Sequence, residues 1–341
     1  MKAAVFAFSR QGLATAERVC AALNGPEDRC RIYAPERLAA KGVTAVTPPL
    51  AAFTGTVFRE SDALVFVGAC GIAVRAIAPH VRDKTTDPAV VAVDELAGFV
   101  IPLLSGHIGG ANALAVRLAD ALGATAAVTT ATDVNGKFSV DAWAAEQRLF
   151  LDDMKAAKAV SAAILERPVP LSSDFPIVTA LPVGIVSGES GEVGICVSWR
   201  RRKPFAATLL LVPRVVRLGI GCRRGTSPEA IGALVDQALA ENGVHPAAVK
   251  AVASIDLKKD EIGLRTFCEA RGWPIEFYTA SQLEAVEGEF TPSDFVRRTT
   301  GVDNVCERAA ALGGGQIIIK KTARDGVTVA AAVEYWEVRF G

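Results

Sequence analysis

A histidine within a glycine-rich loop is the strongest candidate for acid–base chemistry in this sequence. The loop, residues 104–112 (LSGHIGGAN), follows a short apolar run and opens a segment with helical spacing. The imidazole of His107 titrates near neutral pH, so we predict that it is a general acid or base. A histidine that only hydrogen-bonds within its loop is the alternative. Because N–H groups at a helix start attract anions, the loop also predicts a carboxylate or phosphate cradle at Gly106, Gly109, Gly110 and Asn112.

Two carboxylates are predicted to share a site with His107. Asp133 lies in residues 128–136 (VTTATDVNG), where the hydroxyl groups of Thr130 and Thr132 can orient it, and Glu95 follows another apolar run. Ligands bind at the carboxyl edge of an open α/β sheet, and we expect all three residues to meet there. A neighbouring carboxylate favours the protonated imidazole, and we predict this role for Asp133, with Glu95 as a direct base for water. The alternative makes Asp133 a simple turn residue.

Other loops combine glycines or charges in a way that predicts binding of anionic ligand groups. Residues 68–75 (GACGIAVR) begin a helix after an apolar run, a charged loop with Lys84 follows, and residues 218–227 (LGIGCRRGTS) and 254–261 (SIDLKKDE) repeat the theme late in the chain. Turn formation and surface solvation are the alternatives. The candidate substrate-binding residues here are Gly68, Gly71, Arg75, Lys84, Arg223, Arg224, Thr226, Asp256 and Lys258, together with Thr130 and Thr132.

Composition and motif spacing argue against several classes of protein. The 37 basic and 37 acidic side chains cancel, which disfavours nucleic acid as a partner. No glycine run has the spacing of a P-loop or of a dinucleotide-binding loop. Seven cysteines are scattered without a C-x-x-C pair, which argues against a disulfide framework or a structural zinc site. The N-terminus lacks signal-peptide features and no apolar run approaches a membrane span, so we expect a cytoplasmic protein without membrane contact.

The order of apolar and amphipathic segments predicts an α/β fold in three parts. Residues 1–135 alternate apolar strands such as Ala63–Val67, Ala89–Val93 and Phe99–Leu104 with helices, which predicts a doubly wound, mostly parallel sheet. Residues 136–213 contain a helical stretch from Val140 to about Leu165 and then prolines and short strands, which indicates a small α+β unit. Residues 214–341 predict a second α/β domain, in which Ser227 caps a helix over Pro228–Glu241.

Several of these runs, in this order, resemble the CbiG family of cobalamin biosynthesis proteins, the cobalt-precorrin-5A hydrolases. The resemblance covers both large domains, whereas the middle stretch matches mainly by position and length. Ala73 and the polar run 306–310 are mild departures from the family pattern. The matching runs are residues 71–79, 83–90, 104–112 and 129–133 in the first domain and 219–226, 254–258, 300–302 and Glu307 in the last.

The resemblance implies a specific reaction. The substrate is a ring-contracted cobalt corrinoid with many carboxylates, and water opens its δ-lactone. The extruded two-carbon unit then leaves as acetaldehyde, giving cobalt-precorrin-5B, so the enzyme is a hydrolase acting on a carbon–carbon bond. The cobalt travels with the substrate, and the resemblance implies no metal or other cofactor held by the protein. A large flat polyanion would use the anion sites of both α/β domains.

Two other functions remain open at this point. The chain could be a non-catalytic corrinoid carrier or a scaffold for pathway intermediates, or a sugar-phosphate enzyme on the same fold. The missing phosphate fingerprint weakens the second of these. Transient contact with other cobalamin-pathway enzymes and a homodimer are further expectations about partners.

Overall fold

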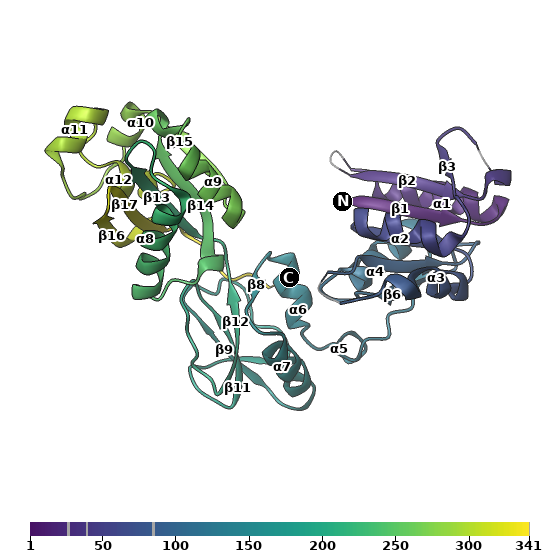
Figure 1. Cartoon of the computed structure of the whole chain (residues 1–341). Coiled ribbons are helices and arrows are strands. Elements are labelled where there is room, and N and C mark those ends of the chain that lie inside the picture. The colour runs from purple at the N-terminus through teal and green to yellow at the C-terminus, as the bar shows by residue number, and fades with distance from the viewer. Residues whose placement is uncertain (26–27, 39, 84–85, 341) are drawn as a thin grey trace. The chain divides into compact units, whose positions relative to one another are not determined.

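The computed structural model describes residues 1–25, 28–38, 40–83 and 86–340, so the candidate Lys84 lies outside the described residues. The chain divides into two compact units, Met1–Glu146 and Gln147–Gly341 (Figure 1). Each unit is described by itself below. The three-part division at residues 135 and 213 stays a prediction. Within the described ranges, every helix is too short or too polar to cross a lipid bilayer.

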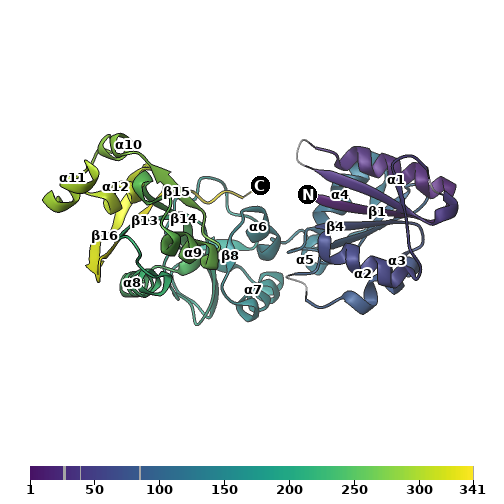
Figure 2. The same ribbon diagram turned by 45° about the horizontal axis from the view of Figure 1, so that its top comes forward.

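The first unit is an α/β unit with helices on both faces of a mostly parallel sheet, which confirms the predicted fold class. The strand order is β3-β2-β1-β4-β5-β6-β7. Figure 2 shows α1 and α4 on one side of this sheet and α2 and α3 on the other. Its elements are β1 (Lys2–Ala7), α1 (Arg10–Leu23), β2 (Arg29–Ala34), β3 (Val43–Ala45), α2 (Leu50–Glu60), β4 (Ala63–Val67), α3 (Cys70–Ile77), β5 (Ala89–Val93), β6 (Phe99–Leu104), α4 (Ala111–Leu122), β7 (Thr125–Ala126), α5 (Ala131–Val134) and α6 (Val140–Glu146).

The central strands β4 and β5 are buried along their whole length. Their uninterrupted apolar sequences suit strands that are covered on both faces. The next strand, β6, runs antiparallel to β5, because a parallel return needs a crossover of a dozen or more residues. The short turn between β5 and β6 is held by Asp94, whose carboxylate accepts from the N–H groups of Leu96 and Phe99. This reversal decides which loops share a sheet edge.

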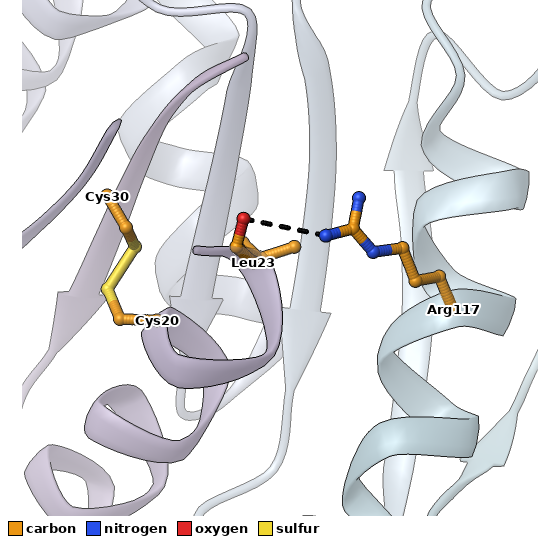
Figure 3. The surroundings of a disulfide bond; sticks show 4 residues. All are labelled: Cys20, Leu23, Cys30 and Arg117. Atoms are coloured by element: carbon orange, nitrogen blue, oxygen red, sulfur yellow. Dashed lines mark hydrogen bonds between the residues drawn. A yellow bond between two sulfur atoms is a disulfide. The ribbon is translucent and has the colours of Figure 1, made fainter. Parts of the chain in front are cut away.

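A disulfide joins Cys20 near the end of α1 to Cys30 at the start of β2 (Figure 3). The expectation drawn from the scattered cysteines is therefore wrong for this pair. The β1–α1–β2 crossover returns the chain beside its starting point and brings the two Cα atoms within 5.5 Å, which cysteine spacing alone does not reveal. In the same region, Arg117 of α4 donates to the carbonyl oxygens of Ala22 and Leu23, which fixes the end of α1.

The second unit contains two sheets. The strand orders are β10-β9-β11-β12-β8 and β15-β14-β13-β17-β16. Its elements are β8 (Phe150–Leu151), α7 (Met154–Glu166), β9 (Val169–Ser173), β10 (Ile185–Ser187), β11 (Val193–Val197), β12 (Ala207–Val212), β13 (Val216–Cys222), α8 (Pro228–Glu241), β14 (Val249–Ile255), α9 (Ile262–Arg271), β15 (Ile275–Tyr278), α10 (Ala280–Glu284), α11 (Asp294–Thr300), α12 (Val305–Ala311), β16 (Gln316–Arg324) and β17 (Val327–Val333).

One hydrophobic core connects the two sheets of this unit. Trp199, Leu210 and Val212 of the first sheet region belong to the same buried cluster as Leu218 and Ile231 of the second. The predicted cap of α8 is confirmed, because the Ser227 hydroxyl accepts from the N–H group of Ala230. The single helix predicted from Val140 to Leu165 is wrong: α6 ends at Glu146, and Asp153 caps a separate helix by accepting two N–H bonds. An N-cap inside an alanine-rich pattern marks a new helix start.

Candidate active site

The loop between β6 and α4 is folded tightly onto itself and presents His107. The N–H groups of Gly110, Ala111 and Asn112 donate to the carbonyl oxygens of His107, Ser105 and Gly106, respectively. These three donors are therefore not free to hold an anion, whereas the predicted binding role of Gly106 and Gly109 stays a prediction. The loop instead fixes the backbone that carries His107. The Ser105 hydroxyl ties it to the start of β5 through the carbonyl oxygen of Asp87, at 2.9 Å.

His107 lies between two carboxylates. Its Nε2 atom is 2.8 Å from Oδ2 of Asp133, and its Nδ1 atom is 3.2 Å from Oδ1 of Asp141. The hydroxyl of Thr132 is 3.2 Å from the same Nε2 atom. A carboxylate can only accept, so a ring with a carboxylate oxygen at each nitrogen carries a proton on each. The geometry therefore favours the imidazolium form of His107.

The electrostatic surroundings support the charged ring. Its hydrogen bond with Asp141 and then that with Asp133 raise the pKa of His107 to about 9, although partial burial of the ring opposes the shift. An imidazole ordinarily titrates near 6.5, so this raised pKa favours the protonated form of His107 in the neutral range.

The predicted partner Asp133 is held by side chains that the sequence also pointed to. Nδ2 of Asn112 donates to Oδ2 of Asp133 at 3.2 Å and to the Thr130 hydroxyl at 2.7 Å. Asp133 lies in α5 after β7, which is parallel to β6, so both loops leave the sheet at the same edge. The structure thus brings together His107, Asp133, Asn112, Thr130 and Thr132. Their roles in the reaction stay predictions.

Asp141 was missed by the reasoning from sequence. Its carboxylate is the more buried of the two, with 10% of the side chain exposed against 36% for Asp133. Oδ1 of Asp141 accepts from the Ser139 hydroxyl and from the N–H group of Ala142, which holds it at the start of α6. The sequence around it has a serine, Ser139, two residues before an acidic residue at the start of a helix. This pattern is typical of helix capping and does not by itself indicate a functional carboxylate.

Glu95 does not join this cluster. Its carboxylate accepts from the Ser9 hydroxyl at 2.7 Å, just after β1, and it follows β5, which runs opposite to β6. The loop with Gly68 and Gly71 also follows a strand parallel to β1, so it lies at the Glu95 edge, and Arg75 is exposed further along α3. The expectation that these loops meet His107 at one edge is wrong, because it assumed a parallel β6.

Part of the late candidate set lines a cavity of about 830 Å³ in the second unit. Arg223, Arg224 and Lys258 contribute to its wall, whereas Asp256 is not among its lining residues. Thr226 lines a neighbouring hollow of about 520 Å³. In that loop the N–H group of Gly225 donates to the carboxylate of Glu261, so an acidic side chain of the protein already occupies the backbone donor there.

The glycines of residues 219–221 have a packing role. A Cβ atom on Gly219 would clash with the carbonyl oxygen of Cys306, because α12 packs directly on β13. The anion site predicted from this run therefore depends on the arginine side chains that follow it.

Two family models match the chain: "Cobalamin synthesis G N-terminal" over residues 52–133 and "Cobalamin synthesis G C-terminus" over residues 216–332. The chain is 35% identical to a cobalt-precorrin-5A hydrolase of Salmonella typhimurium, covering 97% of both chains. It is 33% identical to a cobalt-precorrin-5A hydrolase of Priestia megaterium, covering 81% of this chain and 80% of the relative. It also matches Protein CobE of a Sinorhizobium species at 36% identity, over 34% of this chain and 77% of that protein.

Proposed function

Because the chain belongs to the CbiG family of cobalamin synthesis proteins, we infer that it is a cobalt-precorrin-5A hydrolase and that His107, Asp133 and Asp141 form its proton-transfer centre. The reaction adds water to the δ-lactone of the corrinoid and releases acetaldehyde. The observation that supports the assignment of the centre is the ring of His107, with a carboxylate oxygen at each nitrogen.

The proposed first step opens the lactone. Asp133, the more exposed carboxylate, takes a proton from water while the water oxygen adds to the lactone carbonyl carbon. The bond between that carbon and the ring oxygen then breaks, and the ring oxygen takes the proton from Nε2 of His107. The products are a carboxylic acid and a free hydroxyl group on the substrate, with Asp133 protonated and the imidazole of His107 neutral. Asp141 remains on Nδ1 and keeps the ring oriented.

The proposed second step releases acetaldehyde and restores the imidazolium. The neutral Nε2 atom takes the proton of the freed hydroxyl group, and its oxygen forms the carbonyl of acetaldehyde. The carbon–carbon bond to the macrocycle breaks, and its electron pair passes into the conjugated ring. His107 thus gives a proton and takes one back, and Asp133 releases to the solvent the proton that it took from water, so both groups return to their starting states. The two carboxylates favour this return because they stabilise the protonated ring.

We propose that these steps need no metal or nucleotide held by the protein. The imidazolium protonates the leaving oxygen, and this neutralises the negative charge that a Lewis acid would otherwise stabilise. We further propose that substrate carboxylates pair with cationic side chains of the second unit. A cytoplasmic location, a homodimer and transient contact with other pathway enzymes stay predictions.

The test is acetaldehyde release from the lactone substrate under anaerobic conditions, with and without a chelator. His107→Gln should lower kcat by about 10²–10⁴-fold, the usual contribution of a general acid–base group. His245→Gln is the matched control, because His245 also lies beside a carboxylate, that of Asp152 at 3.2 Å, but in the second unit. Wild-type turnover in His107→Gln would remove His107 from the mechanism. Substrate binding without acetaldehyde release by the unaltered protein would identify a carrier instead.

A further inference from the structure

The cavity of about 830 Å³ in the second unit has walls from five parts of the chain. It lies where β13 and β14 end, and α11, the start of α12 and the β16–β17 hairpin complete it. Pockets that hold small organic ligands measure about 300–1,000 Å³. The size and the position at the carboxyl ends of parallel strands are those of a ligand site.

Positive charge is concentrated on this wall and is only partly neutralised. Lys258 lies 3.6 Å from a carboxylate oxygen of Glu261, and Arg324 donates to Gln237 and lies 3.8 Å from Asp325. Within the described part of the chain, the side chains of Arg223, Arg224 and Lys321 have no ion-pair or hydrogen-bond partner. Like charges held close together repel, so the cavity favours a ligand that brings negative charge.

The rest of the wall is largely apolar. Ile255, Leu257, Val296, Val305 and Val327 face the same cavity as the cations. A small inorganic anion would leave these side chains uncovered. A ligand with a broad apolar body and carboxylates at its rim matches both parts of the wall.

Lys321 is held in place from beneath. Its backbone N–H group donates to the carboxylate of Glu307 at 2.6 Å, and Glu307 is almost fully buried. The same carboxylate accepts from the N–H and hydroxyl groups of Thr291 and from the side-chain amide of Asn304. Glu307 therefore ties β16, α12 and the segment before α11 into one rigid support, and a cation on a rigid strand pairs with a carboxylate at a lower entropic cost.

We propose that this cavity binds the corrin ring, with Lys321, Arg223 and Arg224 pairing with its peripheral carboxylates, and that it holds the ring before and after hydrolysis alike. The proposal rests on the proposed function, which supplies the ligand class. It adds Lys321 and the apolar wall, and it predicts that this site affects affinity without taking part in the chemistry. Uniform binding of substrate and product changes KM and leaves kcat nearly constant.

The experiment measures binding of cobyrinic acid, a cobalt corrinoid with free peripheral carboxylates, to the full-length chain by absorption titration at two salt concentrations. Lys321→Gln should raise Kd by about 10- to 100-fold. The double variant with Arg223→Gln and Arg224→Gln should raise it by a similar factor. Lys321→Arg should restore most of the affinity. Cobinamide, whose peripheral groups are amides, should bind weakly to every variant.

Two controls separate this proposal from the proposed function. Lys259→Gln removes an exposed cation that does not line the cavity, and it should bind like the unaltered chain. His107→Gln should also bind cobyrinic acid normally while releasing little acetaldehyde. Equal affinity of the Lys321 and arginine variants for cobyrinic acid would overturn the cavity proposal and leave the hydrolase assignment standing. Intact, charge-dependent binding by a protein that releases no acetaldehyde would overturn the hydrolase assignment alone.

Discussion

Asp141 sets the charge of His107, because its hydrogen bond to Nδ1 is the largest influence on the ring. Asp141→Asn should therefore lower the pKa of His107 from about 9 toward its ordinary value of 6.5. A ring with that ordinary pKa is largely neutral at pH 8, so turnover there should fall about tenfold or more, with a smaller loss at pH 6. The measurements are an NMR titration of the His107 ring and a pH–rate profile. An unchanged alkaline limb in Asp141→Asn would contradict this role.

The raised pKa of His107 also determines how the stability of the fold should change with pH. The folded-state pKa is raised, so the contribution of the imidazolium to stability is fully present below pH 6.5 and disappears as the pH rises through about 9. Asp141→Asn should lose most of this dependence. A rise in pH through about 9 should therefore reduce both the stability of the fold and the ability of His107 to donate a proton.

Sequence pointed to every member of this cluster except Asp141. His107 and Asp133 each follow a strand, and β6 and β7 are parallel, so the two residues meet as expected. Asp141 lies in the first turn of a helix that follows no long strand. Its neighbouring residues are those of an ordinary helix cap, so they do not indicate that its carboxylate contacts His107. The predicted place of Glu95 is wrong because the short connection after β5 makes β6 antiparallel, so the two strands end at opposite edges of the sheet.

The β5–β6 hairpin determines the two-edged arrangement of the first unit. A turn of a few residues forces antiparallel strands, which sends the His107 loop to the edge opposite the ends of β1, β4 and β5. The strand positions themselves were predictable: β4, β5 and β6 have the bounds expected from their apolar runs. The direction of β6 does not follow from the hydrophobic pattern, but it does follow from the short connection between Val93 and Phe99, which is too short for a parallel crossover.

The loop after β6 should be sensitive to any side chain at Gly109. A Cβ atom there would clash with Ser105 and lie 2.9 Å from its carbonyl oxygen, so Gly109→Ala must displace the backbone next to His107. We expect a loss of about 1–3 kcal/mol in stability and a lower kcat from the displaced ring. Thermal unfolding and acetaldehyde release measure the two effects. Gly232→Ala is the control, because its Cβ atom would meet Phe267 at an ordinary 3.5 Å. Equal behaviour of the two variants would show that the loop tolerates the change.

At the scale of the whole molecule, the two proposed sites belong to different units. The proposed proton-transfer cluster belongs to Met1–Glu146, and the cavity proposed to bind the corrin ring belongs to Gln147–Gly341. Sequence indicated both, through a histidine loop early in the chain and paired arginines late in it. The cavity as such was not predictable, because Lys321 lies in a strand whose pattern shows only that it is partly exposed.

The position of Asp141 leads to a prediction about where the first unit can be cut. The cluster needs α6, which begins at Val140, so a fragment that ends at residue 135 lacks both Asp141 and its support from Ser139. A fragment of residues 1–146 contains every described partner of the His107 ring. We expect the longer fragment to keep the pKa of His107 near 9 and the shorter one to show a value closer to 6.5. NMR titration of the ring in both fragments measures the difference, and circular dichroism checks that each is folded. If two folded fragments titrate alike, the second carboxylate does not control the ring, and the proton-transfer centre reduces to His107 and Asp133.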